Sequence, residues 1–344
     1  MKRYPWLFVL ATAGWSQMAV ADGITLYGLL DAGVGYSRQD GSDSDLTLDS
    51  GVSEDSRFGI RGTEALGSGL TAKFELESGI DLGTGTPADE GRFFDRAAWV
   101  GIEGGFGDLR LGRQATFAHD WFGEVSPFEN DFKQAGVTSI FGFDAVGERI
   151  DNAVFYRLPE FGGFEAGVGY SFNAEGPEVP GQENRVLTVG LRYTAGALVA
   201  VAAYELGRDA DQDAAPGRAD IRNLSVGATY EFSQFKLHAG YGRLKNRDYI
   251  ASALTEKAWL VGATVSVGPG EVLAAYQRVA ERNTNEFGLD STRDGVALAY
   301  LHPLSKRTTL YAYGSRFRNI DERGDDPARL ADRTQVGAGV RHVF

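Results

Sequence analysis

The sequence contains no cysteine among its 344 residues. Without a thiol, the protein can form no disulfide scaffold, no Cys-ligated zinc or iron–sulfur site and no covalent intermediate on a cysteine. Basic residues are also fewer than acidic ones, with 34 Lys and Arg against 47 Asp and Glu, so the formal net charge is −13. A nucleic-acid-binding domain usually carries a basic surface that displaces counterions from phosphates. The charge balance therefore argues against that function.

Long hydrophobic runs are missing as well, and only the first residues come near one. A positively charged start is followed by a short apolar core over residues 6–14 and by the small-residue pattern Ala-Val-Ala at residues 19–21. This order is typical of a secretory signal peptide. We predict that residues 1–21 are removed and that residues 22–344 form a single domain. A membrane-anchoring helix is the alternative, but it needs about 20 apolar residues, and polar residues interrupt this run.

Most of the remaining chain alternates between apolar and polar residues with a period of two. In residues 24–36, one face carries Ile24, Leu26, Leu30, Ala32, Val34 and Tyr36. Residues 70–77 and 336–344 alternate in the same way. A period of two is typical of a strand with one apolar face. No stretch has the caps and apolar spacing of an amphipathic helix, so an all-β fold is predicted.

Sixteen segments have this strand pattern, and the connections between them are alternately short and long. The predicted strands are residues 24–36, 55–63, 70–80, 93–103, 107–113, 149–158, 164–173, 186–194, 197–207, 221–231, 235–245, 258–267, 271–281, 294–302, 308–318 and 333–344. Short turns at one end and long polar loops at the other are typical of a transmembrane antiparallel β-barrel of the outer membrane. A soluble β-sandwich is the alternative, but it does not account for sixteen strands without a domain boundary. Because a barrel of more than eight strands is too wide for side chains to fill, its interior should hold water.

Five segments in order along the chain carry a family resemblance. They are DGITLYGLLDAGVGYS at the predicted mature start, SRFGIRGTEALGSGLTAKFELESGI, RAAWVGIEGGFGDLRLGRQ, ERIDNAVFYRLPEFGGFEAGVGYS and the terminal GVRHVF. Together they resemble the general porins of Gram-negative bacteria, in particular the beta-proteobacterial type. The resemblance implies a homotrimer of sixteen-stranded barrels in the outer membrane. Each barrel would have its own channel, narrowed by a third loop that folds inward.

The third long connection is also unusual in itself. About 35 residues separate Arg113 from Arg149, which is longer than most connections and marks either a functional loop or disorder. Seven aromatic residues in this connection favour order, because they need burial that the inner wall of a barrel could provide. Four acidic residues of the loop are predicted to lie at the constriction: Asp120, Glu124, Glu129 and Asp131. The alternative is an external loop whose acids are solvated.

Basic side chains at inward strand positions are predicted to form the opposite wall. Phe58 and Ile60 should face lipid, so the arginines next to them should face the lumen. Arg96 is opposite in phase to Trp99, and Arg96 and Arg149 also match wall arginines of the family that the chain resembles. A guanidinium that faces lipid at the midplane costs about 2–4 kcal/mol, which favours the inward orientation. The predicted wall residues are Arg57, Arg61, Lys73, Arg96, Arg110 and Arg149; the alternative is that they form structural ion pairs.

These features predict an outer-membrane porin, a channel for passive diffusion of ions and small hydrophilic solutes. Arginines on one wall and carboxylates on the opposing loop would create a transverse field across a narrow, water-filled gap. The preference for anions or cations stays open, because the loop acids are similar in number to the wall cations. A surface adhesin or receptor is an alternative, and so is an outer-membrane hydrolase. The chain has only four histidines and no G-x-S-x-G motif, so no catalytic residue is predicted.

The partners follow from the barrel and from the resemblance. Phe344 ends a predicted strand at the periplasmic edge, where aromatic girdles are favoured, and a terminal aromatic residue resembles the signal that the outer-membrane assembly machinery reads. Lipid and lipopolysaccharide should surround the barrel. In the homotrimer, residues 82–91 are expected at the subunit interface, where Arg113 is expected to meet Asp89 or Glu90.

No cofactor or metal site is predicted. Asp43 and Asp45 in the first long loop have some features of a calcium loop, but they lack the glycine and glutamate spacing of an EF-hand. Structural Ca²⁺ between the acidic loops and anionic lipopolysaccharide is compatible with the sequence, but the sequence does not predict it.

Overall fold

The computed structural model describes residues 23–130, 132–136, 146–178, 180, 184–208, 220–247, 253–283, 291–320 and 331–344. The predicted signal peptide and Asp131 lie outside these residues. Within the described part of the chain, no helix is long and apolar enough to cross a membrane.

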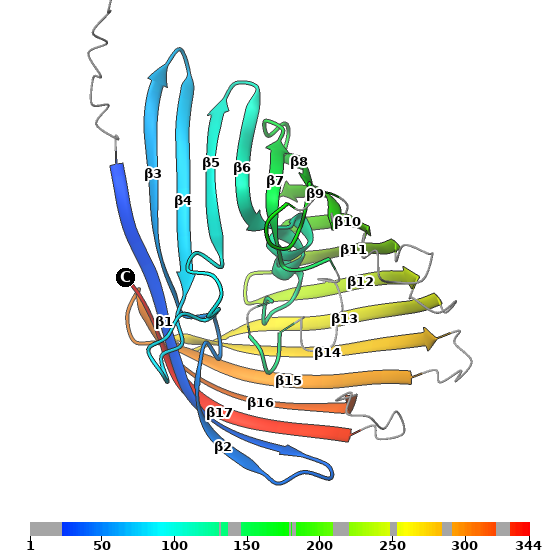
Figure 1. Cartoon of the computed structure of the whole chain (residues 1–344). Helices are drawn as coiled ribbons and strands as arrows, with labels where there is room; N and C mark the ends of the chain where they lie inside the picture. The colour runs from blue at the N-terminus through cyan, green and yellow to red at the C-terminus, as the bar shows by residue number, and fades with distance from the viewer. Residues whose placement is uncertain are drawn as a thin grey trace, which may run out of the picture.

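The described chain forms a closed antiparallel β-barrel (Figure 1). Its strands are β1 (Gly23–Gln39), β2 (Asp45–Ser50), β3 (Arg57–Gly67), β4 (Leu70–Gly79), β5 (Ala97–Gly104), β6 (Gly107–Ala115), β7 (Arg149–Arg157), β8 (Phe164–Ser171), β9 (Arg185–Ala195), β10 (Leu198–Arg208), β11 (Asp220–Glu231), β12 (Phe235–Arg247), β13 (Ala253–Val267), β14 (Gly270–Asn283), β15 (Ser291–Pro303), β16 (Thr308–Ile320) and β17 (Ala331–Val343). The first strand pairs with the last, from Leu29↔Val343 to Gln39↔Arg333, so the sheet has no open edge there. Sixteen strands form the wall, as predicted.

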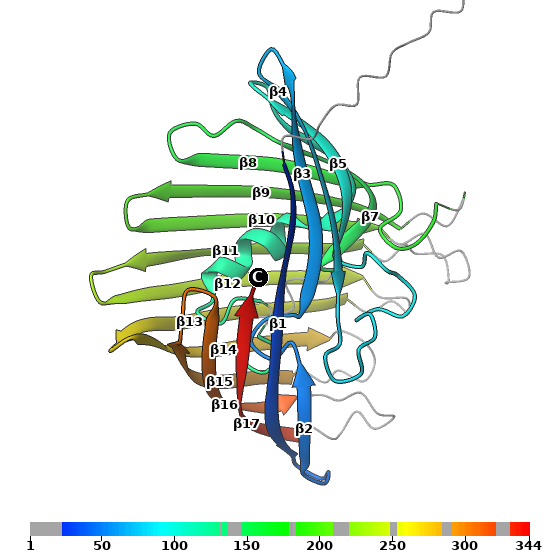
Figure 2. The same cartoon turned by 90° about the vertical axis from the view of Figure 1, so that its left-hand side faces the viewer.

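The seventeenth strand, β2, was not predicted. It lies in the first long connection and pairs with the second half of β1, from Ala32↔Ser50 to Ser37↔Asp45. β3 pairs with the first half of β1, so β1 has β17 on one side and β3 and β2 on the other (Figure 2). The observed strand ends are otherwise close to the prediction. The largest differences are at β3, which ends at Gly67 rather than at residue 63, at β5, which begins at Ala97 rather than at residue 93, and at β13, which begins at Ala253 rather than at residue 258.

Alternate residues of each strand face outward or into the barrel. Apolar side chains on the outward face are exposed, for example Ile24 (66% exposed) and Leu298 (57%). On the inward face, polar side chains such as Asp31, Thr188 and Glu205 are buried. An apolar outer band around a polar interior is the pattern of a barrel that sits in lipid.

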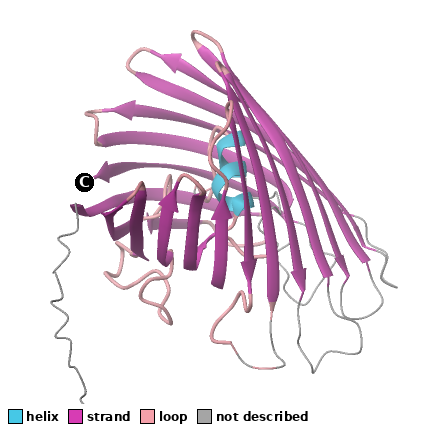
Figure 3. Cartoon of the chain, turned by 90° about the horizontal axis from the view of Figure 1, so that it is seen from above, coloured by secondary structure: helices cyan, strands magenta, loops and turns pink. Residues whose placement is uncertain are grey.

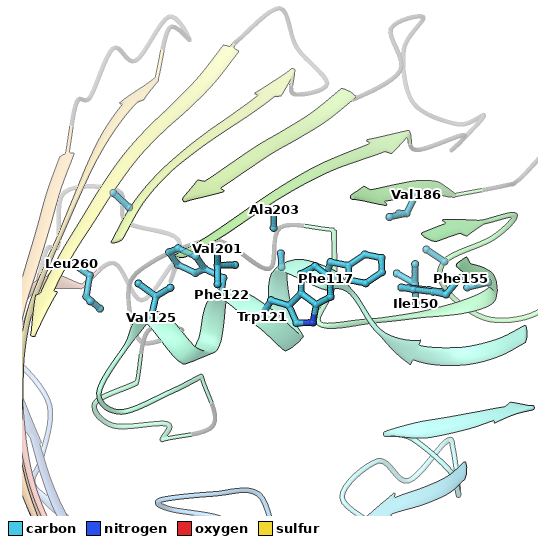
Figure 4. Close-up of a cluster of buried hydrophobic side chains, with 14 of the residues drawn as sticks. Phe117, Trp121, Phe122, Val125, Ile150, Phe155, Val186, Val201, Ala203 and Leu260 are labelled. Atoms are coloured by element: carbon cyan, nitrogen blue, oxygen red, sulfur yellow. The ribbon is translucent and has the colours of Figure 1, made fainter. Parts of the chain in front are cut away.

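The third long connection starts with two short helical turns, η1 (Ala118–Phe122) and η2 (Gly123–Val125). Figure 3 shows these turns inside the ring of strands. Their apolar side chains form a buried cluster with residues of several strands, among them Phe155, Val201 and Leu260 (Figure 4). This part of the connection therefore packs against the inward face of the wall.

Glycines on the inward face make room for this segment. They lie on β8, β9, β11, β12 and β13, and we call them the glycine groove: Gly167, Gly190, Gly227, Gly240 and Gly262. A Cβ atom at Gly190 would lie 2.6 Å from Trp121 Cζ3, and one at Gly262 would lie 2.8 Å from Pro127 Cδ. Carbon atoms in contact are normally about 3.5–4.0 Å apart. Any larger residue in the groove would therefore push the loop side chains away from the wall.

Candidate functional site

A cavity on the inward face of β3–β7 gathers five arginines. Its volume is about 270 Å³, and the start of the third connection closes one side of it. Three carboxylates line the same cavity, those of Glu75, Glu77 and Asp120. We call it the arginine cavity, after Arg57, Arg96, Arg110, Arg149 and Arg157. Among the lining side chains, guanidinium groups outnumber carboxylates five to three. Four of the arginines also pair with carboxylates just outside the lining, those of Glu54, Asp55, Asp108 and Glu148.

All six basic residues predicted from the sequence lie in or beside this cavity. Four of them line it directly. An adjoining cavity of about 260 Å³ contains Arg61 and Lys73, and the two cavities share Glu75, Trp99 and Arg110 as walls. The structure thus brings the six side chains together on one stretch of the inner wall. Their function in a channel stays a prediction.

Arg96 was predicted to face inward because it is opposite in phase to Trp99, and the outward orientation of Trp99 that this implies was wrong. Trp99 faces inward, because it is buried and the Cζ atom of Arg110 lies 4.4 Å from its ring centroid. Val100 faces outward instead and is 57% exposed. Arg96 still reaches the arginine cavity, since β5 begins only at Ala97 and the residue before it does not follow the alternation of the strand.

Carboxylates hold most of these arginines in place. Arg96 lies between Asp55 and Glu77, with N···O distances of 2.9 and 2.8 Å. Arg57 Nη2 lies 2.5 Å from Glu54 Oε1. Charge-assisted hydrogen bonds of this kind fix the plane of a guanidinium. Five of the six residues predicted as a channel wall therefore form structural ion pairs in the described chain, and their role as a channel wall stays a prediction.

Asp55 connects the arginine wall to the third connection. Its Oδ2 accepts a hydrogen bond from Arg96 Nη1, and its Oδ1 lies 3.1 Å from Lys133 Nζ. Burial by itself would raise the pKa of this carboxyl, but the charges of Arg96 and Lys133 outweigh burial and lower the pKa below its usual range. The ionised carboxylate therefore ties residue 133 to the wall.

Two of the predicted loop acids pair with arginines that were not among the predicted wall residues. Asp120 Oδ2 lies 2.9 Å from Arg157 Nη2, and Glu124 Oε2 lies 2.9 Å from Arg192 Nη2. Burial raises the pKa of Glu124 above its usual value, and the charge of Arg192 opposes this effect. Asp120 and its partner Arg157 both line the arginine cavity, whereas Glu124 is paired with Arg192 outside that lining.

The alternation of the strands could have revealed both arginines. Arg192 follows the exposed Leu191, so it falls on the inward face of β9. Arg157 ends β7 two residues after the buried Phe155. Its Cζ atom lies 5.4 Å from the ring centroid of Phe117, within reach of a cation–π contact. Arg157 therefore supports the loop as well as lining the arginine cavity.

The other described loop acid, Glu129, lines a different cavity near the short turns, with a volume of about 450 Å³. Its charged lining is Glu124, Glu129, Glu231 and Glu271 with Lys236 and Arg341. Asp131 is outside the described residues. Among the residues that the structure describes, no three His, Asp or Glu side chains are grouped so that they could hold a metal ion.

Arg113 was expected to meet an acid of a neighbouring subunit, but it is paired within its own chain. Its Nη1 atom donates to Asp151 Oδ1 at 2.7 Å, and its Nε atom donates to the carbonyl oxygen of Asp95 at 2.6 Å. Arg92 Nη2 lies 2.9 Å from the other carboxylate oxygen of Asp151. Within the chain the partner acid of Arg113 is therefore Asp151, and the contact with Asp89 or Glu90 of a neighbouring subunit stays a prediction.

Phe344 lies where the barrel closes. Its backbone N–H donates to the carbonyl oxygen of Gly28 at 3.0 Å, and Gly28 N–H donates back to Phe344 at 3.2 Å. The Phe344 side chain is 41% exposed. The last residue thus ends the seam between the first and last strands.

Comparisons with known proteins agree with this architecture. The model of the Gram-negative porin family matches residues 7–322. An outer membrane porin protein of Bordetella pertussis is 33% identical over 385 residues, covering 96% of this chain and 97% of that protein. The outer membrane porin protein 32 of Delftia acidovorans is also 33% identical and covers 98% of both chains. Among solved structures, an anion-selective porin from Comamonas acidovorans has a TM-score of 0.78 and 29% identity, and the match covers 94% of this chain and 99% of that protein.

Proposed function

Because this chain belongs to the Gram-negative porin family, we propose that its arginine cavity lies at the constriction of a diffusion channel. The protein is a passive channel of the outer membrane for small solutes, and it is not an enzyme. The observation that carries the proposal is the convergence of five guanidinium groups on one cavity of the inner wall, next to the third connection. Their field across a water-filled gap orients dipolar solutes and attracts anions.

We infer that the channel prefers anions. Guanidinium groups exceed carboxylates in the arginine cavity, five to three. The net charge of −13 does not decide the preference, because exposed charges more than about 8–10 Å away are largely screened at physiological salt. The related protein from Comamonas acidovorans is described as an anion-selective porin, which supports the same direction here.

Reversal potentials in planar bilayers test both parts of this proposal. The folded wild-type protein should give conductance that rises with salt, and a KCl gradient should give a reversal potential of the anion-selective sign. R110Q should move this potential toward the cation side, because it removes a cavity charge while Lys73, 3.6 Å from Asp108, still partners that carboxylate. R307Q, at an exposed turn, is the matched control. Absence of channels contradicts the diffusion function, whereas channels that prefer cations contradict only the anion assignment.

We further propose that three copies of the chain assemble and that residues 1–21 are a cleaved signal peptide. Ile60, Val100 and Leu111 expose an apolar arc on β3, β5 and β6 that suits contact with another copy. Lipopolysaccharide around the barrel and the outer-membrane assembly machinery are the other partners that we propose. The mass of the detergent-solubilised protein tests the trimer, and a monomer alone would contradict it.

A further inference from the structure

Arg61 differs from the other basic residues predicted for the inner wall. Each of the other five is paired with an acid of the chain. Among the residues that the structure describes, no carboxylate lies within ion-pair distance of the Arg61 guanidinium. Its side chain is exposed and adjoins a cavity of the inner wall. Arg61 therefore offers the lumen a positive charge that no neighbouring acid neutralises.

Tyr27 accounts for this difference. The sheet register places Glu75 directly opposite Arg61, and opposite charges at such positions normally attract each other. Glu75 Oε1 instead accepts a hydrogen bond from Tyr27 OH at 2.6 Å, and the same hydroxyl lies 2.9 Å from Glu77 Oε2. The Tyr27 ring crosses Gly59, where a Cβ atom would lie 2.5 Å from Tyr27 Cζ. Arg61 Cζ lies 5.0 Å from the ring centroid, within reach of a cation–π contact. The tyrosine thus occupies the acid that Arg61 would otherwise bind and holds the guanidinium beside its ring.

The cavity beside Arg61 combines hydrogen-bond donors with an aromatic surface. We call this cavity of about 260 Å³ the Arg61 cavity; the strands around it, β1, β3, β4 and β5, lie side by side in Figure 1. The hydroxyl groups of Thr25 and Thr63 line it, and Thr25 is directly opposite Arg61 in the register. Trp99 lies between this cavity and the arginine cavity, because it lines both. Trp99 is only 8% exposed, and no hydrogen bond of the described chain uses its indole N–H. A guanidinium, two hydroxyls and an indole N–H are therefore available to one solute.

We propose that the Arg61 cavity is a binding site for monocarboxylates with an aromatic body. The inference rests on the proposed function, since the solute enters through the channel, and it names the class of anion that the channel holds. A carboxylate accepts two parallel hydrogen bonds from the Arg61 guanidinium, and its ring packs against Trp99, where an aromatic pair contributes beyond the burial of area. One negative charge matches the one unpaired cation of the described wall. A second negative charge on the solute would be repelled by Glu75, which also lines the cavity.

Calorimetric titration of sodium benzoate into the detergent-solubilised full-length protein tests the site. Sodium acetate lacks the ring and benzyl alcohol lacks the charge, so both should bind more weakly than benzoate. Loss of the charge-assisted contact in R61Q should raise the dissociation constant of benzoate on the order of tenfold. R307Q, which removes an exposed cation at a short turn, should bind as the wild type does. W99F removes the indole N–H and should weaken benzoate binding more than acetate binding. Equal affinities for benzoate and acetate, or equal benzoate affinity in R61Q and the wild type, would overturn the proposal.

Tyr27 is a positioning residue in this proposal, and a rescue experiment tests that role. Y27F keeps the Arg61 charge but releases Glu75, which should then pair with Arg61 and weaken benzoate binding nearly as much as R61Q does. In Y27F/E75Q the competing carboxylate is gone, so benzoate binding should return. A purely structural role of Tyr27 predicts no rescue, and that result would overturn the positioning role.

Chloride conductance of the same proteins separates this inference from the diffusion function. Channels that carry chloride with the anion-selective sign but bind benzoate no better than acetate contradict only the aromatic monocarboxylate site. Absence of channels contradicts the diffusion function itself.

Discussion

The contact between the glycine groove and the third connection can be tested by a substitution that fills the groove. In G190V, the new Cβ would lie 2.6 Å from Trp121 Cζ3 and 2.8 Å from Phe117 Cβ. Restoring normal carbon contacts requires a displacement of about 1 Å, and two further methyl groups add to it. Overpacking of this kind typically costs about 1–3 kcal/mol. We expect the start of the third connection to move away from the wall into the lumen, which lowers single-channel conductance and the temperature at which the oligomer dissociates.

The matched control is G314V, because a Cβ at Gly314 meets no atom closer than 3.7 Å. A second test is rescue: W121A should lessen the effect of G190V, since it removes the ring that the valine displaces. The two substitutions should then be strongly non-additive. If G190V conducts and melts as G314V does, or if W121A does not lessen the effect, the loop is not seated in the groove as described.

Three further predictions concern stability and assembly. The lowered pKa of Asp55 stabilises the fold fully above about pH 4, the ordinary range of the carboxyl, and this stabilisation is lost as the pH falls through the lowered pKa. Thermal melting should therefore show an acid-side decrease that D55N lacks, and an equal decrease in D55N would refute the assignment. The Asp31 carboxylate accepts hydrogen bonds from Tyr311 OH at 2.5 Å and from three backbone N–H groups of residues 52–54. D31A should therefore lower the free energy of unfolding by about 2–4 kcal/mol in denaturant melts. A decrease of less than about 1 kcal/mol would contradict this prediction. Deletion of Phe344 should lower the yield of inserted trimer in cells far more than it changes the conductance of trimers that form, and unchanged insertion yield would show that the ring only fills the aromatic girdle.

Local alternation along the chain determined the class of fold. The period of two predicted the sixteen wall strands, because a pleated strand points successive side chains to opposite faces whatever its neighbours are. The same rule placed Arg57 and Arg61 on the inner wall. It failed for Arg96, which precedes the regular strand, and it was not applied to Arg157 and Arg192, although it would have found them. β2 lies in a polar loop and has only 6 residues, so its alternation does not stand out from the acidic residues around it.

Only the tertiary structure decided which charges meet. Arg96 binds Asp55, 41 residues away. Asp120 pairs with Arg157 inside the arginine cavity, and Glu124 pairs with Arg192 outside its lining. These pairs depend on the register between strands and on the path of the third connection, and neither has a local signature in the sequence. The role of the glycine groove also depends on the path of the third connection. A glycine in a strand shows that something comes close, but only the fold shows that the close neighbour is the third connection.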